Sequence, residues 1–330
     1  MTDTAPESVT VQRDIPFHEM DGVTLTLDLY DSPAASGPKP VAVLVRGGAF
    51  TSGDKGEFAR HALDLAADGF LVIEPQYRLA PEWTFPAALV DVKAAIEWAR
   101  TEGESYGADT DHIVGVGHSA GANLVVLAAL TADEPGFEPE LYPGASSGLS
   151  AVVGYAGIYD FHALDNAADD EADAPHRAYL TGGPDDEPAA YDLASPVGQV
   201  NTDAPPTLLL HGTNDDVVPP AQSELLADAL GPMTDVVHET VPSDHGFPFH
   251  GANYDDVYER TVEFIRRVGV GGPDTGDAAG AGERTGLPGG NLPGPADRID
   301  DLGPGDTRAR IAATAPDSDG QVEKLSSSQK

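Results

Sequence analysis

A serine between two glycines, in Gly117-His118-Ser119-Ala120-Gly121, has the spacing that exposes a hydroxyl on a sharp turn. Largely apolar residues 112–116 precede it and apolar residues 122–130 follow it, which predicts a strand, a tight turn and a buried helix. On such a turn the serine backbone is strained, the glycines relieve crowding, and the helix N-terminus lies behind the hydroxyl. The same short pattern occurs in ordinary Ser/Gly loops, so the flanking strand and helix are what favour Ser119 as a nucleophile.

A serine nucleophile needs a base, because its hydroxyl reacts poorly at neutral pH. An imidazole, with an ordinary pKa of about 6.5, suits this task, and a carboxylate fixes its tautomer and stabilises the imidazolium. Asp215 and His245 each follow a predicted strand. We therefore predict a catalytic triad of Ser119, Asp215 and His245.

The acid of this triad has a neighbouring rival, Asp216. Asp215 lies four residues beyond His211, at the end of the preceding strand. The side chain of Asp216 would point away from the predicted site. The pattern therefore favours Asp215.

The base also has rivals among the ten histidines of the chain. His238 is expected in the middle of a strand, packed or facing solvent, and His250 at the start of a helix. His118 and His211 flank predicted catalytic positions and are expected to support their loops by hydrogen bonding. His238, His245 and His250 can also be interpreted as a metal cluster, but their spacing fits no familiar helical ligand motif, so we expect neither a metal nor a cofactor.

Backbone amides near the serine could stabilise a negative oxygen. Gly47 and Gly48 follow the apolar run 41–45, and glycines at a strand end let N–H groups approach a reacting oxygen. We predict an oxyanion hole formed by Gly47, Gly48 and Ala120, in which one donor lowers the barrier by about 3 kcal/mol.

Alternating strands and helices predict the scaffold that positions these residues. Residues 8–30 alternate in polarity around Asp21-Gly22, which predicts an antiparallel hairpin at a sheet edge. The expected later strands are residues 41–45, 70–73, 112–116, 150–155, 206–211 and 235–241. The expected helices are residues 53–67, 85–100, 122–130, 219–230 and 254–268. This order predicts a mostly parallel sheet covered by helices on both faces, with ligands bound at the carboxyl ends of its strands.

Two segments depart from this alternation. Residues 160–205 are acidic, contain Pro and Gly, and carry scattered aromatic residues, so we expect an insertion that forms a partial lid. Residues 270–330 are rich in Gly, Pro, Ala and Asp without aromatic residues, which predicts a disordered tail after a domain of residues 1–269.

Composition excludes several classes of protein. The chain has 330 residues, of which 40% are hydrophobic, and it contains no cysteine, so disulfides, thiolate metal sites and a cysteine nucleophile are excluded. No apolar run reaches the length of a membrane span and the N-terminal residues lack the pattern of a signal peptide, so we expect a cytoplasmic protein.

Charge is strongly unbalanced, with 55 acidic and 18 basic residues and a net charge of −37. Such a chain repels nucleic acid and anionic lipid, so neither is an expected partner. In molar salt the Debye length falls to about 3 Å and the internal repulsion is screened, which favours a halophilic cytoplasm.

Six motifs together resemble the α/β-hydrolase superfamily, in particular its esterase and lipase branch. They are Arg46-Gly47-Gly48-Ala49-Phe50, Tyr77-Arg78-Leu79-Ala80-Pro81-Glu82, Phe85-Pro86-Ala87-Ala88, Gly117-His118-Ser119-Ala120-Gly121, His211-Gly212-Thr213-Asn214-Asp215 and Asp244-His245-Gly246. Gly117-His118-Ser119 is similar to the feruloyl and acetyl-xylan esterase-like members. The superfamily usually has His-Gly-Gly-Gly at the oxyanion strand, so Arg46 and Ala49 are departures, and we expect the loop support of that histidine to be lost.

The resemblance and the triad together imply a serine hydrolase that cleaves small carboxylic esters, with short acyl groups because the insertion is polar. Two alternatives stay open. The same residues could serve an amidase, such as a formamidase, or a peptidase, or the fold could bind a ligand without catalysis.

Overall fold

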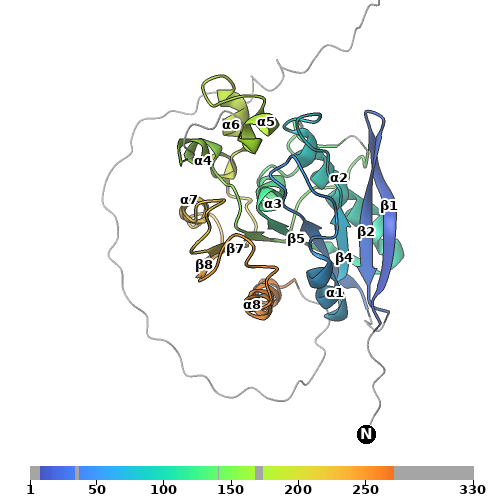
Figure 1. Ribbon diagram of the computed structural model, residues 1–330. Helices are drawn as coiled ribbons and strands as arrows, with labels where there is room; N and C mark the ends of the chain where they lie inside the picture. The colour runs from blue at the N-terminus through green and yellow to red at the C-terminus, as the bar shows by residue number, and fades with distance from the viewer. Residues whose placement is uncertain (1–7, 34–36, 140, 168–173, 271–330) are drawn as a thin grey trace, which may run out of the picture. The chain divides into compact units, whose positions relative to one another are not determined.

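The computed structural model describes residues 8–33, 37–139, 141–167 and 174–270, and these residues form one mixed sheet covered by helices (Figure 1). The strands lie in the order β1-β2-β4-β3-β5-β6-β7-β8. They are β1 (Thr10–Met20), β2 (Val23–Asp31), β3 (Lys39–Val45), β4 (Leu71–Pro75), β5 (Ala108–His118), β6 (Ala151–Tyr155), β7 (Thr207–Gly212) and β8 (Val236–Val241). Strands β3 to β8 pair in parallel with one another, so the predicted mostly parallel sheet is confirmed.

The N-terminal hairpin forms an edge of this sheet. Strand β1 pairs antiparallel with β2, which in turn pairs antiparallel with β4. Asp21 and Gly22 have φ angles of 54° and 78°, the left-handed conformation that a tight hairpin turn requires. Register shifts between Gln12 and Ile15, and between Pro16 and His18, interrupt the pairing of β1. The predicted edge hairpin is therefore confirmed, with an irregular outer strand.

Helices cover both faces of the sheet, which explains why the central strands contain continuous apolar runs. One face packs against α2 (Ala87–Glu102), α3 (Ala120–Leu130) and α7 (Ala221–Leu230). The other packs against α1 (Ala59–Ala67) and α8 (Tyr254–Arg267). A short 3-10 helix, η1 (Gly103–Tyr106), follows α2. Every residue of α3 is buried, as predicted for the helix behind the serine.

The first helix begins later than predicted. The expected start was Gly53, but α1 begins at Ala59. Gly53 and Gly56 have φ angles of 96° and 110°, which no right-handed helix contains. The Glu74 carboxylate accepts the N–H groups of Gly56 and Phe58 at 2.6 and 3.0 Å, so these turns are held by a side chain instead of a helical ladder.

The predicted insertion contains short helices grouped together at one side of the molecule (Figure 1). They are α4 (Phe161–Ala167), α5 (Pro175–Leu180), α6 (Pro188–Ala194) and the 3-10 helix η2 (Pro196–Gln199). The aromatic residues that marked this segment, Phe161, Tyr179 and Tyr191, are fully buried. Tyr179 stacks on Phe50, with ring centres 4.0 Å apart, so the insertion packs against the loop that follows β3. Its role as a lid stays a prediction, and the predicted tail lies outside the described residues except for Val270.

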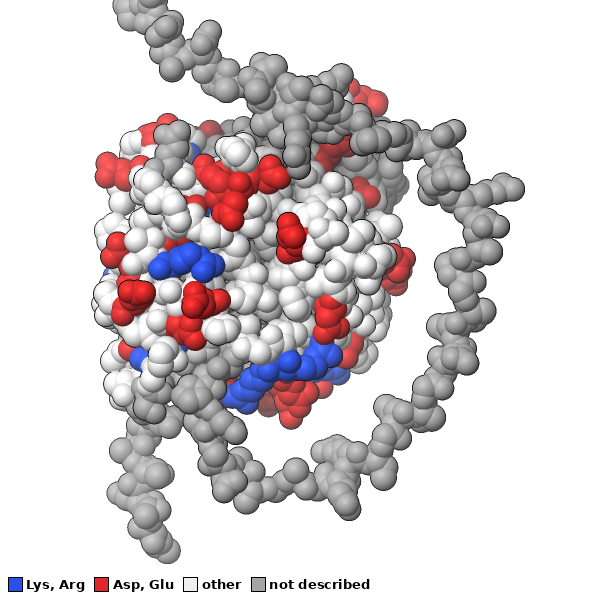
Figure 2. Space-filling model, turned by 180° about the vertical axis from the view of Figure 1, so that it is seen from behind, with Lys and Arg blue, Asp and Glu red and all other residues white. Residues whose placement is uncertain are grey.

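Acidic side chains are spread over the surface, and basic ones lie beside them. On the face seen in Figure 2, the basic side chains gather in two places, each next to acidic groups. The three lysines within the described part of the chain, Lys39, Lys55 and Lys93, each contact a carboxylate. No helix among the described residues is both long and apolar enough to cross a membrane.

Candidate active site

The sharp turn predicted around the serine lies between β5 and α3. Ser119 has φ 55° and ψ −120°, a strained conformation for a residue with a side chain, and its N–H donates to the carbonyl of Tyr155 at 2.8 Å. A Cβ atom at Gly117 would lie 2.3 Å from the Gly121 carbonyl oxygen, and one at Gly121 would lie 2.0 Å from that of Val45. Both glycines are therefore required for the turn to fit between strand and helix.

The predicted acid and base meet directly. His245 Nδ1 lies 2.7 Å from Oδ2 of Asp215, so the proton on Nδ1 is donated to the carboxylate and Nε2 is left as the basic atom. The other carboxylate oxygen, Oδ1, accepts the N–H groups of Val217 and Val218 at 2.9 and 2.8 Å. The rival Asp216 is exposed. The structure thus brings Asp215, and not its neighbour, to the histidine.

Hydrogen bonds keep the Asp215 carboxylate ionised although it is buried. Burial raises its pKa, but hydrogen bonds from His211, His245 and the Val218 amide outweigh burial and hold the pKa far below the usual range. His211 Nε2 lies 3.2 Å from Oδ2 of Asp215, and its Nδ1 lies 2.6 Å from Oγ of Ser223. The expectation that His211 supports this loop by hydrogen bonding is therefore confirmed.

The loop that carries His245 is held against the serine turn. His118 Nε2 lies 3.0 Å from the backbone carbonyl oxygen of His245, and the two rings are 4.8 Å apart between centres. Because His118 directly precedes Ser119, this contact joins the loop of the predicted base to the turn of the predicted nucleophile. The supporting role expected of His118 is confirmed.

The amides predicted to form the oxyanion hole differ in their availability. A Cβ atom at Gly47 would lie 3.2 Å from Cβ of Ser119, so this loop passes close to the serine. However, the Gly47 N–H donates to Oε2 of Glu57 at 2.6 Å, which argues against its predicted role as an oxyanion donor. The amides of Gly48 and Ala120 have no acceptor within the described part of the chain.

Arg46 supports the loop that follows β3 and carries Gly47 and Gly48, here called the oxyanion loop. This corrects the expectation that support of this loop is lost when the usual histidine is absent. Its Nη1 atom donates to the carbonyl oxygens of Gly47 and Ser52 at 2.8 and 2.6 Å. Its guanidinium lies over the Tyr77 ring, 4.1 Å from the ring centre, and the Tyr77 hydroxyl also donates to the Gly47 carbonyl at 2.8 Å. The Gly47 carbonyl and the Gly48 N–H belong to the same trans peptide and point in opposite directions. The bonds to the Gly47 carbonyl therefore aim the Gly48 N–H away from Arg46.

The rival histidines lie apart from this arrangement. His238 lies on β8, and its buried Nε2 has no hydrogen-bond partner among the described residues. His250 is exposed, 3.6 Å from Asp244. Helix α8 begins at Tyr254 as predicted, so the expectation that His250 lies at the start of a helix is wrong. Over the described ranges, no three His, Asp or Glu side chains converge in a way that could hold a metal ion.

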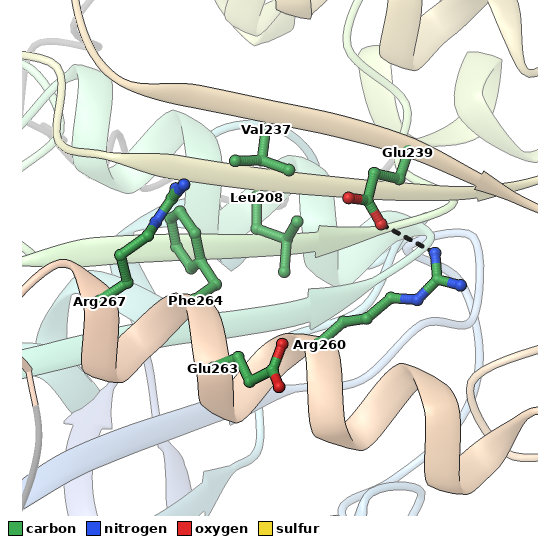
Figure 3. A pocket seen from close by; sticks show the side chains of 7 residues that line it. All are labelled: Leu208, Val237, Glu239, Arg260, Glu263, Phe264 and Arg267. Carbon is green, nitrogen blue, oxygen red and sulfur yellow. Dashed lines mark hydrogen bonds and ion pairs between the residues drawn. The ribbon is translucent and has the colours of Figure 1, made fainter. Parts of the chain in front are cut away.

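A hollow of about 150 Å³ between α8 and the last two strands contains none of the predicted site residues (Figure 3). It lies beside Leu208, near the amino end of β7, whereas Asp215 follows the carboxyl end of that strand. Arg260 at its rim is paired with Glu239 at 2.8 Å, and Arg267 with Asp235 at 3.1 Å. Both arginines that line this hollow are thus already paired with carboxylates.

A sequence model of the BD-FAE family matches residues 27–230, a stretch that includes Ser119 and Asp215. The chain belongs to the BD-FAE family. The resemblance to the α/β-hydrolase superfamily and its esterase branch is thereby confirmed.

Curated relatives of this BD-FAE protein include two esterases of Mycobacterium tuberculosis. Esterase LipC is 36% identical over 197 residues, which cover 58% of this chain and 48% of LipC. Esterase LipQ is 34% identical over 220 residues, which cover 66% of this chain and 52% of LipQ. The chain therefore spans about half the length of these relatives.

A solved structure shares the fold. The apo form of Thermogutta terrifontis esterase 2 superimposes with a TM-score of 0.67 at 24% identity, over 82% of this chain and 97% of that protein. The likeness confirms the α/β-hydrolase fold of this BD-FAE member.

Two features of the site were not predicted from the sequence. Glu57 contacts both the oxyanion loop and His118, yet it belongs to none of the six motifs. The contact between Arg46 and Tyr77 joins two motifs that were recognised separately. Neither contact has a sequence signal, because each joins residues far apart in the chain.

Proposed function

We propose that this protein is a serine hydrolase of carboxylic esters, with Ser119 as nucleophile, His245 as base and Asp215 as its partner. The observation that carries the proposal is the 2.7 Å contact between Asp215 and His245, in a loop bonded to the strained turn of Ser119. Its relatives LipC and LipQ are named esterases, and a third, LipM, is named a probable carboxylic ester hydrolase.

The reaction proceeds in two similar halves. His245 Nε2 takes the hydroxyl proton as Ser119 Oγ attacks the ester carbonyl carbon, and the carbonyl oxygen becomes negative. The amides of Gly48 and Ala120 donate to this oxygen, and each donor lowers the barrier by about 3 kcal/mol. His245 then protonates the departing alcohol, and a water molecule activated by the same Nε2 releases the acid from Ser119.

Short acyl groups fit the site best. Among the described residues, none of the exposed large hydrophobic side chains lies in the insertion of residues 160–205. Its aromatic rings are buried against each other and against Phe50, so they offer no apolar surface for a long chain. We propose that this insertion forms a partial lid over a small-molecule ester.

Hydrolysis of p-nitrophenyl acetate tests the proposal. We expect Ser119→Ala to lower kcat/KM by roughly four orders of magnitude, because the nucleophile is removed. Ser105→Ala, at an exposed serine of η1, is the matched control and should behave as wild type. Equal rates for wild type and Ser119→Ala would refute the proposal.

The same assay separates the two alternatives. An amidase would turn over N-formylkynurenine faster than an aryl ester. The comparison is needed because the same imidazole would protonate either leaving group, so the triad alone does not distinguish the two activities. A protein that only binds ligands would hydrolyse neither compound and would form no adduct between Ser119 and a fluorophosphonate.

We further propose that the protein works in a cytoplasm of high salt and binds no nucleic acid. The net charge of −37 supports this, since molar salt screens the repulsion between its carboxylates. The melting midpoint should rise between dilute buffer and molar KCl, and a midpoint that stays constant would contradict the proposal.

A further inference from the structure

Glu57 bonds two separate parts of the candidate active site. It lies in the turn before α1, and its side chain is 31% exposed. Oε2 accepts the N–H of Gly47 at 2.6 Å, in the oxyanion loop. Oε1 lies 3.2 Å from Nδ1 of His118, in the serine turn. One carboxylate therefore joins the loop after β3 to the residue before the nucleophile.

The second nitrogen of His118 extends this connection to the base. Nε2 lies 3.0 Å from the backbone carbonyl oxygen of His245, which can only accept a hydrogen bond. Nε2 must therefore carry a proton. The side chain of His118 is only 8% exposed, so water competes little for these contacts.

The Glu57 side chain is suited to accept both of these contacts. Burial raises the pKa of Glu57, but the hydrogen bond and charge of His118, the Gly47 amide and the charge of Arg46 outweigh burial and lower it below the usual value. An ionised carboxylate can only accept hydrogen bonds, which suits it to the Gly47 N–H on one oxygen and to the His118 ring on the other. The other titratable rings near His118 are His245 and His61.

We propose that Glu57 and His118 are positioning residues that hold the oxyanion loop and the base loop in register with Ser119. The proposal rests on the esterase function proposed above. The connection runs from the Gly47 amide through the Glu57 carboxylate and the His118 ring to the His245 carbonyl. It fixes the backbones that carry the oxyanion donors and the base, while neither side chain touches the substrate.

Loss of the connection should therefore slow the chemical step without weakening substrate binding. We expect Glu57→Ala and His118→Ala each to lower kcat for p-nitrophenyl acetate by about 10- to 100-fold, with KM changed by less than about threefold. The double variant should be no slower than the worse single variant, because both substitutions break the same connection. His112→Ala is the matched control, at a half-exposed histidine paired with Asp109.

Glu57→Gln separates the connection from the charge. A glutamine amide can accept from Gly47 through its oxygen and donate to a neutral His118 through its nitrogen. This variant should therefore keep kcat within about fivefold of wild type.

Active-site titration with a fluorophosphonate keeps the test independent of folding, since rates are compared per labelled Ser119. Wild-type kcat in Glu57→Ala and His118→Ala would overturn the proposal, as would additive losses in the double variant. If Glu57→Ala does not fold, a Glu57→Gln variant as slow as His118→Ala would overturn it. Failure of the esterase function itself would appear differently, as equal rates for wild type and Ser119→Ala.

Discussion

The guanidinium of Arg46 lies over the ring of Tyr77, 4.1 Å from its centre, and both side chains donate to the carbonyl oxygen of Gly47. A buried arginine thus occupies the position where the superfamily usually has histidine. Its guanidinium donates to two carbonyl oxygens of the loop after β3, those of Gly47 and Ser52. A histidine ring, with at most two N–H groups, could satisfy these carbonyls only in part. The departure from the usual motif changes which side chain supports the loop and leaves the support itself in place.

Arg46→Met should loosen the oxyanion loop. The Gly47 and Ser52 carbonyls would each lose a charged donor. We therefore expect the free energy of unfolding, measured in urea, to fall by about 2–4 kcal/mol. We also expect a drop in kcat of about tenfold, because the Gly48 amide is no longer aimed. Arg13→Met, at a side chain that is 71% exposed, should change neither quantity. An Arg46→Met protein with wild-type kcat would show that the loop holds its shape alone.

Gly121→Ala should be among the most damaging single substitutions in the chain. The added methyl group would lie 2.0 Å from the Val45 carbonyl oxygen, so strand β3 and helix α3 would have to separate. We expect the free energy of unfolding to fall by more than about 3 kcal/mol, or the variant not to fold. Gly251→Ala provides the control, since a Cβ atom there would meet nothing within 4 Å. Thermal melting of both variants checks this, and similar midpoints would contradict it.

The insertion should become less stable in acid. A hydrogen bond from Arg177, partly offset by burial and joined by one from His176, lowers the pKa of Asp165 to about 2. A carboxylate with a lowered pKa stabilises the fold above its unfolded value of about 3.9, and this contribution is lost as the pH falls towards 2. Asp165→Asn should therefore increase hydrogen exchange in residues 174–194 near neutral pH and have little effect near pH 2. An equal effect at both values would contradict this assignment.

A second acid-sensitive group is His61. Burial, with smaller effects from the charges of Arg60 and His118, lowers its pKa to about 3. Within the described part of the chain, neither ring nitrogen has a hydrogen-bond partner. The unfolded chain binds the proton below about pH 6.5, so the stability from the neutral ring is complete above that pH and declines towards pH 3. Between pH 6.5 and 4, we expect the free energy of unfolding to fall by about 3 kcal/mol less in His61→Leu than in the wild type. Urea unfolding at both values measures it, and parallel curves for wild type and variant would disprove it.

Local sequence patterns were sufficient to predict the sheet and the positions that follow its strands. The turn around Ser119 is specified within five residues, because Gly117 and Gly121 are the positions where any side chain would meet backbone. The pairing of Asp215 with His245 follows from a different rule, that the carboxyl ends of neighbouring parallel strands meet at one edge. Strands β7 and β8 are such neighbours.

Features that depend on contacts between distant segments could not be predicted. The start of α1 was placed too early because the carboxylate that holds residues 53–58 in turns, Glu74, lies on the next strand. The role of Glu57 and the compensation by Arg46 likewise need the loop after β3, β4 and the serine turn to be assembled first. Charge and residue type mark these positions as ordinary polar residues.

The broken register of β1 has a consequence for the chain in concentrated solution. Salt strong enough to screen a charge of −37 also removes the repulsion that keeps molecules apart, and an open sheet edge is then a template for intermolecular strand pairing. Two register shifts interrupt the pairing of this strand, and Pro16, at the second of them, offers no amide proton. The outermost strand thus discourages aggregation by its shape, which ionic strength does not weaken.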